Sequence, residues 1–341
     1  GYMNYIYLLR ALGVSRKFET ASGDQIRVLT GCVLSSLVFN QKKWGDHFTM
    51  EVYKGLAGVT DEIEKHRAAA YANHRLGYLE YSKGRLDLAE QMIGKAVDNA
   101  RLGQEFQTEV LAYSLFILFR VAQGRFDDAL EFYNRYEALA KKYASSYFNV
   151  FHQYGLINQK IYCLAMLGRL SEAREALNFL EQIAVEFKFS GLSLIAVHRC
   201  KLMVLYQEKN WSAARELAVQ NASELSEDVT NKAYLFTCVS LPLEVLLDAL
   251  HQHAAWTPEE RSVAKTLLST LDQTQTRFKL VTPTFLILNA KYLLYVERRI
   301  GKARKLLERA LELSNQMGLS VEQTKAALML TALRENQVDP S

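Results

Sequence analysis

The chain has 341 residues, 49% of them hydrophobic, and its 41 Lys and Arg residues nearly balance its 37 Asp and Glu residues. This size and apolar content suffice for a large buried core. Because charges of both signs are mixed along the chain, no basic stripe is present, and we expect no direct nucleic-acid binding. Only four prolines and 17 glycines occur, which favours helices with short connections over β-rich domains.

The chain begins with Gly1 and carries no signal peptide, which predicts a cytoplasmic fragment of a longer protein. Residues 1–28 are predicted to form an N-terminal capping helix region. The apolar run that starts at Val28, VLTGCVLSSLVF, is about 12 residues long and too short to span a bilayer. We therefore expect no membrane association.

The cysteines are far apart in the sequence, lie in apolar surroundings and form no Cys-x-x-Cys pair. They are Cys32, Cys163, Cys200 and Cys238. This distribution predicts small core residues in a reducing compartment, with disulfides or metal ligation as the alternatives.

A Gly-Arg turn followed by an alanine-containing amphipathic segment recurs along the chain. The copies are SKGRLDLAEQMIGKA from Ser82, AQGRFDDALEFYNRY from Ala122 and LGRLSEAREALNFL from Leu167. Weaker copies start at Glu208 and Glu297, and QKKWGDHFTMEVYKGL is a degenerate first copy. The segment AWTPEERSVAKT adds a helix start with proline and glutamates in its first turn.

The repeat has a period near 40 residues. The equivalent positions are His47, Ala89, Ala129, Ala173, Ala214, Ala264 and Ala303, at successive intervals of 42, 40, 44, 41, 50 and 39 residues. Such a period is typical of a solenoid, in which each unit buries its apolar face by stacking on its neighbours. Each unit is predicted to be two helices, with a left-handed glycine ending the first and the alanine at their close crossing.

These residues resemble the tetratricopeptide repeat (TPR). Leu76 and Gly77 match the Leu-Gly of its first helix, and Ala89, Ile93 and Ala96 match its second helix. The chain departs from the pattern in having Asn73 at the tryptophan position, no proline after the second helix and a longer period. The resemblance implies a single all-α domain over residues 1–341, a right-handed superhelical solenoid of about seven helix-turn-helix repeats with a capping helix at 314–341.

The long, proline-poor units also resemble the sensor domains of bacterial signalling ATPases, especially those of maltose-activator-type LuxR-family regulators. The ending RKLLERALELSNQMGLSVEQTKAALMLTALRENQ is similar in style to these domains. The resemblance implies a non-catalytic sensor or regulatory module of a transcription or signalling protein, with any ATPase or DNA-binding domain outside this chain. The alternative is a free-standing scaffold that binds a protein partner.

No catalytic, phosphate-binding or cofactor motif is found, so the sequence predicts neither an enzyme nor a cofactor. His251 and His253 would point about 200° apart on a helix and do not predict a shared metal ion.

In TPR solenoids the first helix of each unit lines the concave groove. Transfer of that geometry by offset from the alanines predicts a groove for a protein, peptide or small effector. The residues selected are Tyr71, His74, Tyr78, Tyr81, Asn158, Tyr162, Arg199, Met203, Tyr206, Phe285, Tyr292 and Tyr295, with Leu111, Ser114, Leu118 and Val121 in the third unit. Tyrosine combines a rigid apolar face with a hydroxyl, which suits a binding groove. The alternative is that the tyrosines fill gaps between long helices.

Overall fold

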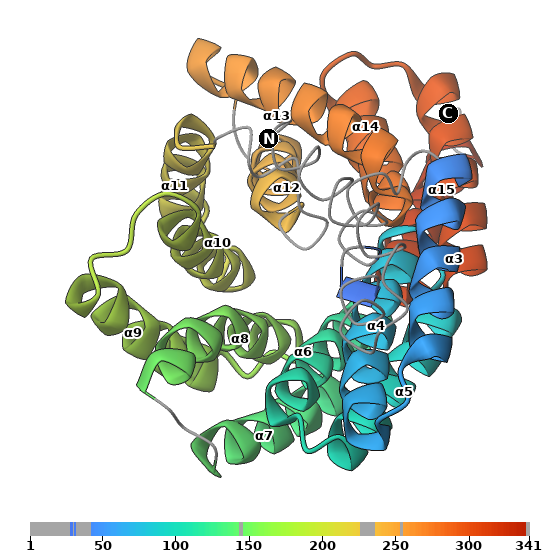
Figure 1. Cartoon of the computed structure of the whole chain (residues 1–341). Helices are drawn as coiled ribbons and strands as arrows, with labels where there is room; N and C mark the ends of the chain where they lie inside the picture. Colours follow the sequence, from blue (N-terminus) through green and yellow to red (C-terminus); the bar gives the residue numbers. More distant parts are fainter. Residues whose placement is uncertain are drawn as a thin grey trace. The chain divides into compact units, whose positions relative to one another are not determined.

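The structure is a computed structural model that describes residues 28–29, 31, 42–142, 146–225, 236–252 and 255–338. Within these ranges it contains fourteen α-helices, one short 3-10 helix and no strand (Figure 1), which confirms the predicted all-α fold for this part of the chain. The helices are α3 (Lys42–Gly58), α4 (Glu62–Ser82), α5 (Leu86–Leu102), α6 (Phe106–Ala122), α7 (Phe126–Lys142), α8 (Ser146–Met166), α9 (Leu170–Glu186), α10 (Leu192–Gln207), α11 (Trp211–Ser223), α12 (Thr237–Gln252), α13 (Pro258–Arg277), η3 (Lys279–Val281), α14 (Thr282–Tyr295), α15 (Ile300–Met317) and α16 (Ser320–Val338).

The chain divides into two compact units. The first comprises Gly1–Phe119 and Phe132–Ala144, and the second comprises Arg120–Glu131 and Ser145–Ser341. Helices α8 to α16 belong to the second unit, whereas α6 and α7 each contribute residues to both. The predicted N-terminal capping region lies outside the described residues except for Val28, which is helical and buried.

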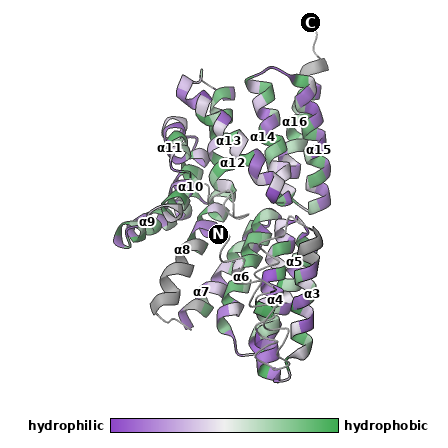
Figure 2. Cartoon of the chain, turned by 45° about the horizontal axis from the view of Figure 1, so that its top comes forward, coloured by the Kyte–Doolittle hydropathy of each residue, from purple (hydrophilic) through white to green (hydrophobic). Residues whose placement is uncertain are grey.

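In the second unit, consecutive helices pack as pairs, and the first helices of successive pairs also contact one another. Helix α8 pairs with α9, α10 with α11, α12 with α13 and α14 with α15, while α8, α10, α12, α14 and α16 form a continuous row of neighbours. We call these five the first helices and α9, α11, α13 and α15 the second helices. Figure 2 shows hydrophobic and hydrophilic residues alternating along each helix, as expected of helices that bury one stripe.

The alanines of the repeat occupy the predicted close contacts. Ala89, Ala129, Ala173, Ala214, Ala264 and Ala303 lie on α5, α7, α9, α11, α13 and α15, and each is fully buried. A larger side chain there would push the paired helices apart. In the first copy, the predicted buried position was His47, which is one residue before the position that is buried in the structure. His47 is exposed, and α3 buries Phe48 and Val52 instead, because these two larger apolar residues share one helix face.

The left-handed turn after the first helix persists where its glycine is replaced. The backbone φ angle is +77° at Gly84, +71° at Gly124 and +73° at Gly168, and it is +58° at both Lys209 and Arg298. The following amide closes the turn: Arg169 N donates to Leu164 O at 2.9 Å, and Asn210 N donates to Leu205 O at 2.9 Å. The weaker repeat copies therefore keep the turn geometry without the residue that favours it.

This turn gives a pair of opposite predictions for stability. Gly168→Ala is expected to destabilise the protein by about 1 kcal/mol, because alanine disfavours the left-handed region; an added Cβ would meet no neighbouring atom, so the cost is in the backbone alone. Lys209→Gly is expected to stabilise it by up to about 1 kcal/mol for the converse reason. Thermal unfolding followed by circular dichroism measures both shifts. If both substitutions changed the stability by the same amount and in the same direction, the left-handed turn would not be the cause of the change.

The boundaries of the later helices are also defined by specific capping features. Helix α13 begins with Pro258 after a reciprocal cap, in which Thr257 Oγ1 accepts from Glu260 N and the Glu260 carboxylate accepts from Thr257 N. The predicted C-terminal helix at 314–341 starts later than expected. Residues 314–317 end α15, and a left-handed Gly318 with a φ of +70° separates it from α16. None of the described helices combines the length and apolar character that a membrane span requires.

Candidate functional site

The predicted residues of the first unit separate into one that lines a cavity and others that are packed. Tyr71 lines a cavity of about 390 Å³ together with Glu64, Arg67, Arg75, Glu105 and Leu111. The Arg75 guanidinium lies over the Tyr71 ring, 5.1 Å from its centroid, in the geometry of a cation–π contact. Tyr71, a predicted groove residue, therefore borders open space in the first unit.

His74, Tyr78 and Tyr81 lie deeper in the first unit. Tyr81 is 3% exposed and stacks on Phe119 with ring centroids 5.2 Å apart, and Tyr78 contacts Tyr81. Burial lowers the pKa of His74 to about 4, nearby Arg75 adds to the drop, and the hydrogen bond with the Leu111 backbone opposes it. His74 is therefore neutral at physiological pH, and the three side chains contribute to packing.

In the second unit, polar side chains gather on the first helices and connect them to one another. We call this set the polar band; its members are Asn158 and Tyr162 on α8, Arg199 and Tyr206 on α10, Thr237, Glu244 and Asp248 on α12, Thr284 and Lys291 on α14, and Glu322 and Lys325 on α16. Four of them, Asn158, Tyr162, Arg199 and Tyr206, were predicted as groove residues. The structure thus brings these four together with acids and lysines from the later helices.

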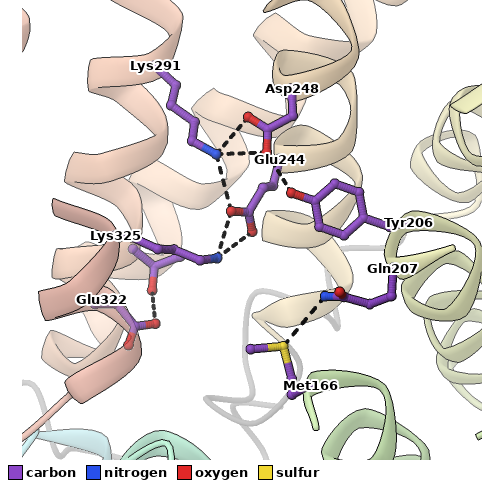
Figure 3. A network of polar contacts seen from close by, with 9 residues as sticks. Met166, Tyr206, Gln207, Glu244, Asp248, Lys291, Glu322 and Lys325 are labelled. Atoms are coloured by element: carbon purple, nitrogen blue, oxygen red, sulfur yellow. Dashed lines mark hydrogen bonds and ion pairs between the residues drawn. The ribbon is translucent and has the colours of Figure 1, made fainter. Parts of the chain in front are cut away.

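At the centre of the polar band, two acids of α12 hold lysines from two other helices (Figure 3). Lys291 Nζ lies 2.7 Å from Asp248 Oδ1 and 3.3 Å from Glu244 Oε1, and Lys325 Nζ lies 2.6 Å from Glu244 Oε1. Tyr206 donates its hydroxyl to Asp248 Oδ2 at 2.6 Å. Because Glu244 and Asp248 are four residues apart on one helix face, a single turn of α12 joins α10, α14 and α16.

Burial and pairing set the charge states of this centre. Burial by itself would raise the pKa of Glu244, but Lys325 and Lys291 outweigh it and lower that pKa to about 2. Burial likewise opposes the charge on Lys291, and Glu244 and Asp248 reverse the effect, so that its pKa is raised. Glu322 differs: burial raises its pKa and Lys325 only partly compensates, while its Oε1 accepts a hydrogen bond from Thr284 at 3.1 Å.

Around Arg199 the polar band is organised differently. The Arg199 guanidinium donates to Thr237 Oγ1 at 2.6 Å, and its other terminal nitrogen lies 3.9 Å from Cys200 Sγ. Cys200 Sγ in turn lies 3.0 Å from Asn158 Oδ1. Within the described residues, Arg199 has no carboxylate within 4 Å. Three first helices therefore meet at a buried cation that has no acidic partner.

Tyr162 lies between the two parts of the polar band. Burial raises the pKa of its hydroxyl, Glu322 and Glu244 add to the rise, and Arg199 opposes it. The side chain is only partly buried, and within the described part of the chain its hydroxyl has no hydrogen-bond partner. Tyr162 is thus near both the acid–lysine centre and Arg199 while its own hydrogen-bonding capacity is unused.

The remaining predicted residues of the second unit are packed. Met203 is buried, Tyr292 is buried with its ring centroid 6.3 Å from that of Trp256, and Tyr295 stacks on His251 at 4.4 Å. Phe285 is partly buried on α14. These contacts tie α12 and α14 together, so the tyrosines of α14 fill space between helices.

The sequence prediction missed Glu244, Asp248, Lys291, Glu322 and Lys325. A signal for three of them was present: SLPLEVLLDAL places Glu244 and Asp248, and LILNAKYLLY places Lys291, inside an apolar run, and such a residue is buried only with a partner.

In the described residues, no group of three or more His, Cys, Asp or Glu side chains is arranged to hold a metal ion. Cys163, Cys200 and Cys238 are buried and free, as predicted, and Cys32 lies outside the described residues. Comparison of the chain with protein-family models gives no match, and comparison with curated proteins gives none either.

Proposed function

We propose that this chain is a non-catalytic binding module whose first helices receive a protein, peptide or small effector. In this proposal the helix pairs form a right-handed superhelical solenoid of about seven TPR-like repeats. The module is the sensor or regulatory part of a bacterial transcription or signalling protein, similar to the maltose-activator-type LuxR-family regulators, and it acts in the cytoplasm.

The observation that supports this proposal is the separation of chemistry between the two kinds of helix in the second unit. Apart from the Arg215–Glu260 ion pair between α11 and α13, the second helices meet their neighbours through buried alanines and leucines, such as Ala173 and Leu177. The first helices instead carry the polar band. Polar side chains are expensive to bury and contribute little to stability compared with apolar packing, so a continuous polar row on one set of helices is typical of a binding surface.

The proposed coupling to attached domains follows from how the polar band is connected. Lys325 and Glu244 lie 81 residues apart in the sequence and are in direct contact. A ligand that altered one of these contacts would change the fit between α12, α14 and α16 together. In a solenoid, small rotations between units add along the chain, which allows binding to be sensed at its end.

The test compares two triple variants in an affinity capture from extracts of the source cells. One changes the first helices through Tyr162→Phe and Lys325→Ala in the polar band and Gln207→Ala at the end of α10, and the other changes exposed second-helix positions through Phe179→Ala, Lys265→Ala and Lys305→Ala. We expect the first variant to retain its effector or partner at least tenfold more weakly, which is about 1.4 kcal/mol, and the second to bind as the parent does.

Circular dichroism confirms that both variants are folded before capture. The opposite pattern, in which the second-helix variant loses binding and the first-helix variant keeps it, would place the binding surface on the second helices and contradict the proposed function.

A further inference from the structure

Three hydrogen-bond donors around Arg199 have unused capacity. Arg199 is 5% exposed and Asn158 is 9% exposed, and within the described residues the hydrogen-bond partners of Arg199 are a hydroxyl and a thiol sulfur. The Asn158 amide oxygen interacts with Cys200, while its NH₂ group has no protein partner in the described part of the chain. The Tyr162 hydroxyl is likewise unpaired there. Asn158 and Tyr162 are four residues apart and lie on the same side of α8.

An arrangement of this kind is unfavourable without a ligand. Guanidinium carries a charge that cannot be removed by deprotonation, and burial of an ion without an opposite charge is among the most costly features of a folded chain. Lys291, which is buried to a similar extent, shows the usual solution, since it lies against both Asp248 and Glu244. Arg199 has no carboxylate partner of this kind within the described residues, and an external anion would provide one.

The contacts of the polar band distinguish Arg199 from the two lysines. Glu244 and Asp248 balance Lys291 and Lys325 through the contacts of Figure 3. Glu322 accepts a hydrogen bond from Thr284, and burial raises the pKa of its carboxyl while Lys325 opposes that rise. Arg199 has no such contact within the described residues, because its partners there are Thr237 and Cys200, and the carboxylate of a ligand would supply one.

We propose that Arg199, Asn158 and Tyr162 bind the carboxylate of a monoanionic ligand on the first helices of the second unit. The guanidinium fork matches a carboxylate in a two-point contact, and the Asn158 amide and the Tyr162 hydroxyl donate to its remaining lone pairs. Thr237 positions the guanidinium through its 2.6 Å hydrogen bond. The negative charge of nearby Glu244 disfavours a doubly charged group such as a phosphate dianion. This inference rests on the proposed function and names the chemistry of the effector.

The experiment uses ligand-observed NMR on the full chain with four small monocarboxylates: acetate, butyrate, benzoate and phenylacetate. Each is paired with its primary amide, which has nearly the same shape and no charge. We expect at least one carboxylate to bind at least tenfold more tightly than its amide, and inorganic phosphate to bind more weakly than that carboxylate. Amides that bind as well as the acids, or phosphate that binds more tightly, would overturn the proposal.

The variants locate the binding. Arg199→Met is expected to abolish carboxylate binding, Arg199→Lys to weaken it at least tenfold because the fork is lost, and Tyr162→Phe to weaken it about tenfold, as is typical for one hydrogen bond to a charged group. Arg174→Met is the matched control, since Arg174 is exposed on α9 and pairs with Glu208. Binding that survives in folded Arg199→Met, or is lost equally in Arg174→Met, would contradict the assignment. If Arg199→Met does not fold, Tyr162→Phe and Arg199→Lys decide the result.

The two proposals fail in different ways. A neutral effector captured on the polar band would overturn the carboxylate assignment and leave the proposed function in place. Carboxylate binding at Arg199 combined with unchanged capture by the polar-band variant would retain the anion site and overturn the proposed function.

Discussion

Glu244→Gln is expected to reduce the free energy of unfolding by about 3 kcal/mol at neutral pH, because loss of one member of a buried ion network leaves its partners uncompensated. Lys291 would keep only Asp248, and Lys325 would lose both of its close contacts with Glu244. Glutamine is close to glutamate in shape, so the loss reports charge and not a cavity. Urea unfolding followed by circular dichroism measures the difference.

The pH dependence of that difference provides a second check. The folded-state pKa of Glu244 is lowered from 4.5 to about 2 by its lysine partners, against the opposing effect of burial. A carboxyl with a lowered folded pKa contributes stability above its unfolded pKa and loses that contribution as the pH falls toward the folded pKa. The difference between the parent and Glu244→Gln should therefore be full at pH 7 and shrink as the pH falls from 4.5 toward 2.

Glu312→Gln is the control for this prediction. Glu312 pairs with Arg309 on the exposed surface of α15, where both side chains are more than half exposed, and its removal should change stability by less than about 0.5 kcal/mol. If Glu244→Gln were as stable as this control at pH 7, the acid–lysine centre would contribute nothing to the fold.

Asn221→Leu is expected to stabilise the protein by about 2 kcal/mol. Asn221 on α11 is fully buried, and neither its amide nitrogen nor its amide oxygen has a hydrogen-bond partner among the residues that the structure describes. Each unsatisfied buried polar group costs about 1–3 kcal/mol, and leucine has nearly the same shape without that cost. Thermal and urea unfolding both measure the gain.

The neighbouring residue supplies the comparison for Asn221. Gln220 is exposed and donates to Glu224 at 3.2 Å, so Gln220→Leu should leave stability nearly unchanged. Destabilisation by Asn221→Leu would mean that the amide makes a favourable polar contact in solution, and the prediction would be wrong.

Much of the fold could be predicted from the sequence, because the glycines and alanines of the repeat each have a direct steric role. Glycine at the turn and alanine at the crossing gave the correct positions from Gly84 to Ala173, and all six alanines are buried. The prediction was less accurate where other residues adopt the same geometry. Lys209 and Arg298 adopt the left-handed turn without glycine, and α3 uses Phe48 as its buried anchor.

The candidate site was only partly predictable. Offsets from the alanines led to Arg199, Asn158 and Tyr162, but the 50-residue interval between Ala214 and Ala264 prevented the same transfer to α12. Glu244 was missed for this reason. The pairing of a residue with another one 81 positions later depends on the stacking of α12, α14 and α16, which no local pattern specifies. Contacts across a solenoid follow from its three-dimensional packing and not from its period.

The contact between Lys325 and Glu244 also has a consequence for how the chain opens. In a stacked array the terminal helices usually fray first, because they have a neighbour on one side only. Here α16, the last helix that the structure describes, is bonded past α14 to α12, so α16 cannot detach without breaking the contact between Lys325 and Glu244. We expect amide hydrogen exchange in α12, α14 and α16 to occur as one cooperative event, with α16 protected as well as α12. The C-terminal end of the array would then behave as part of its interior.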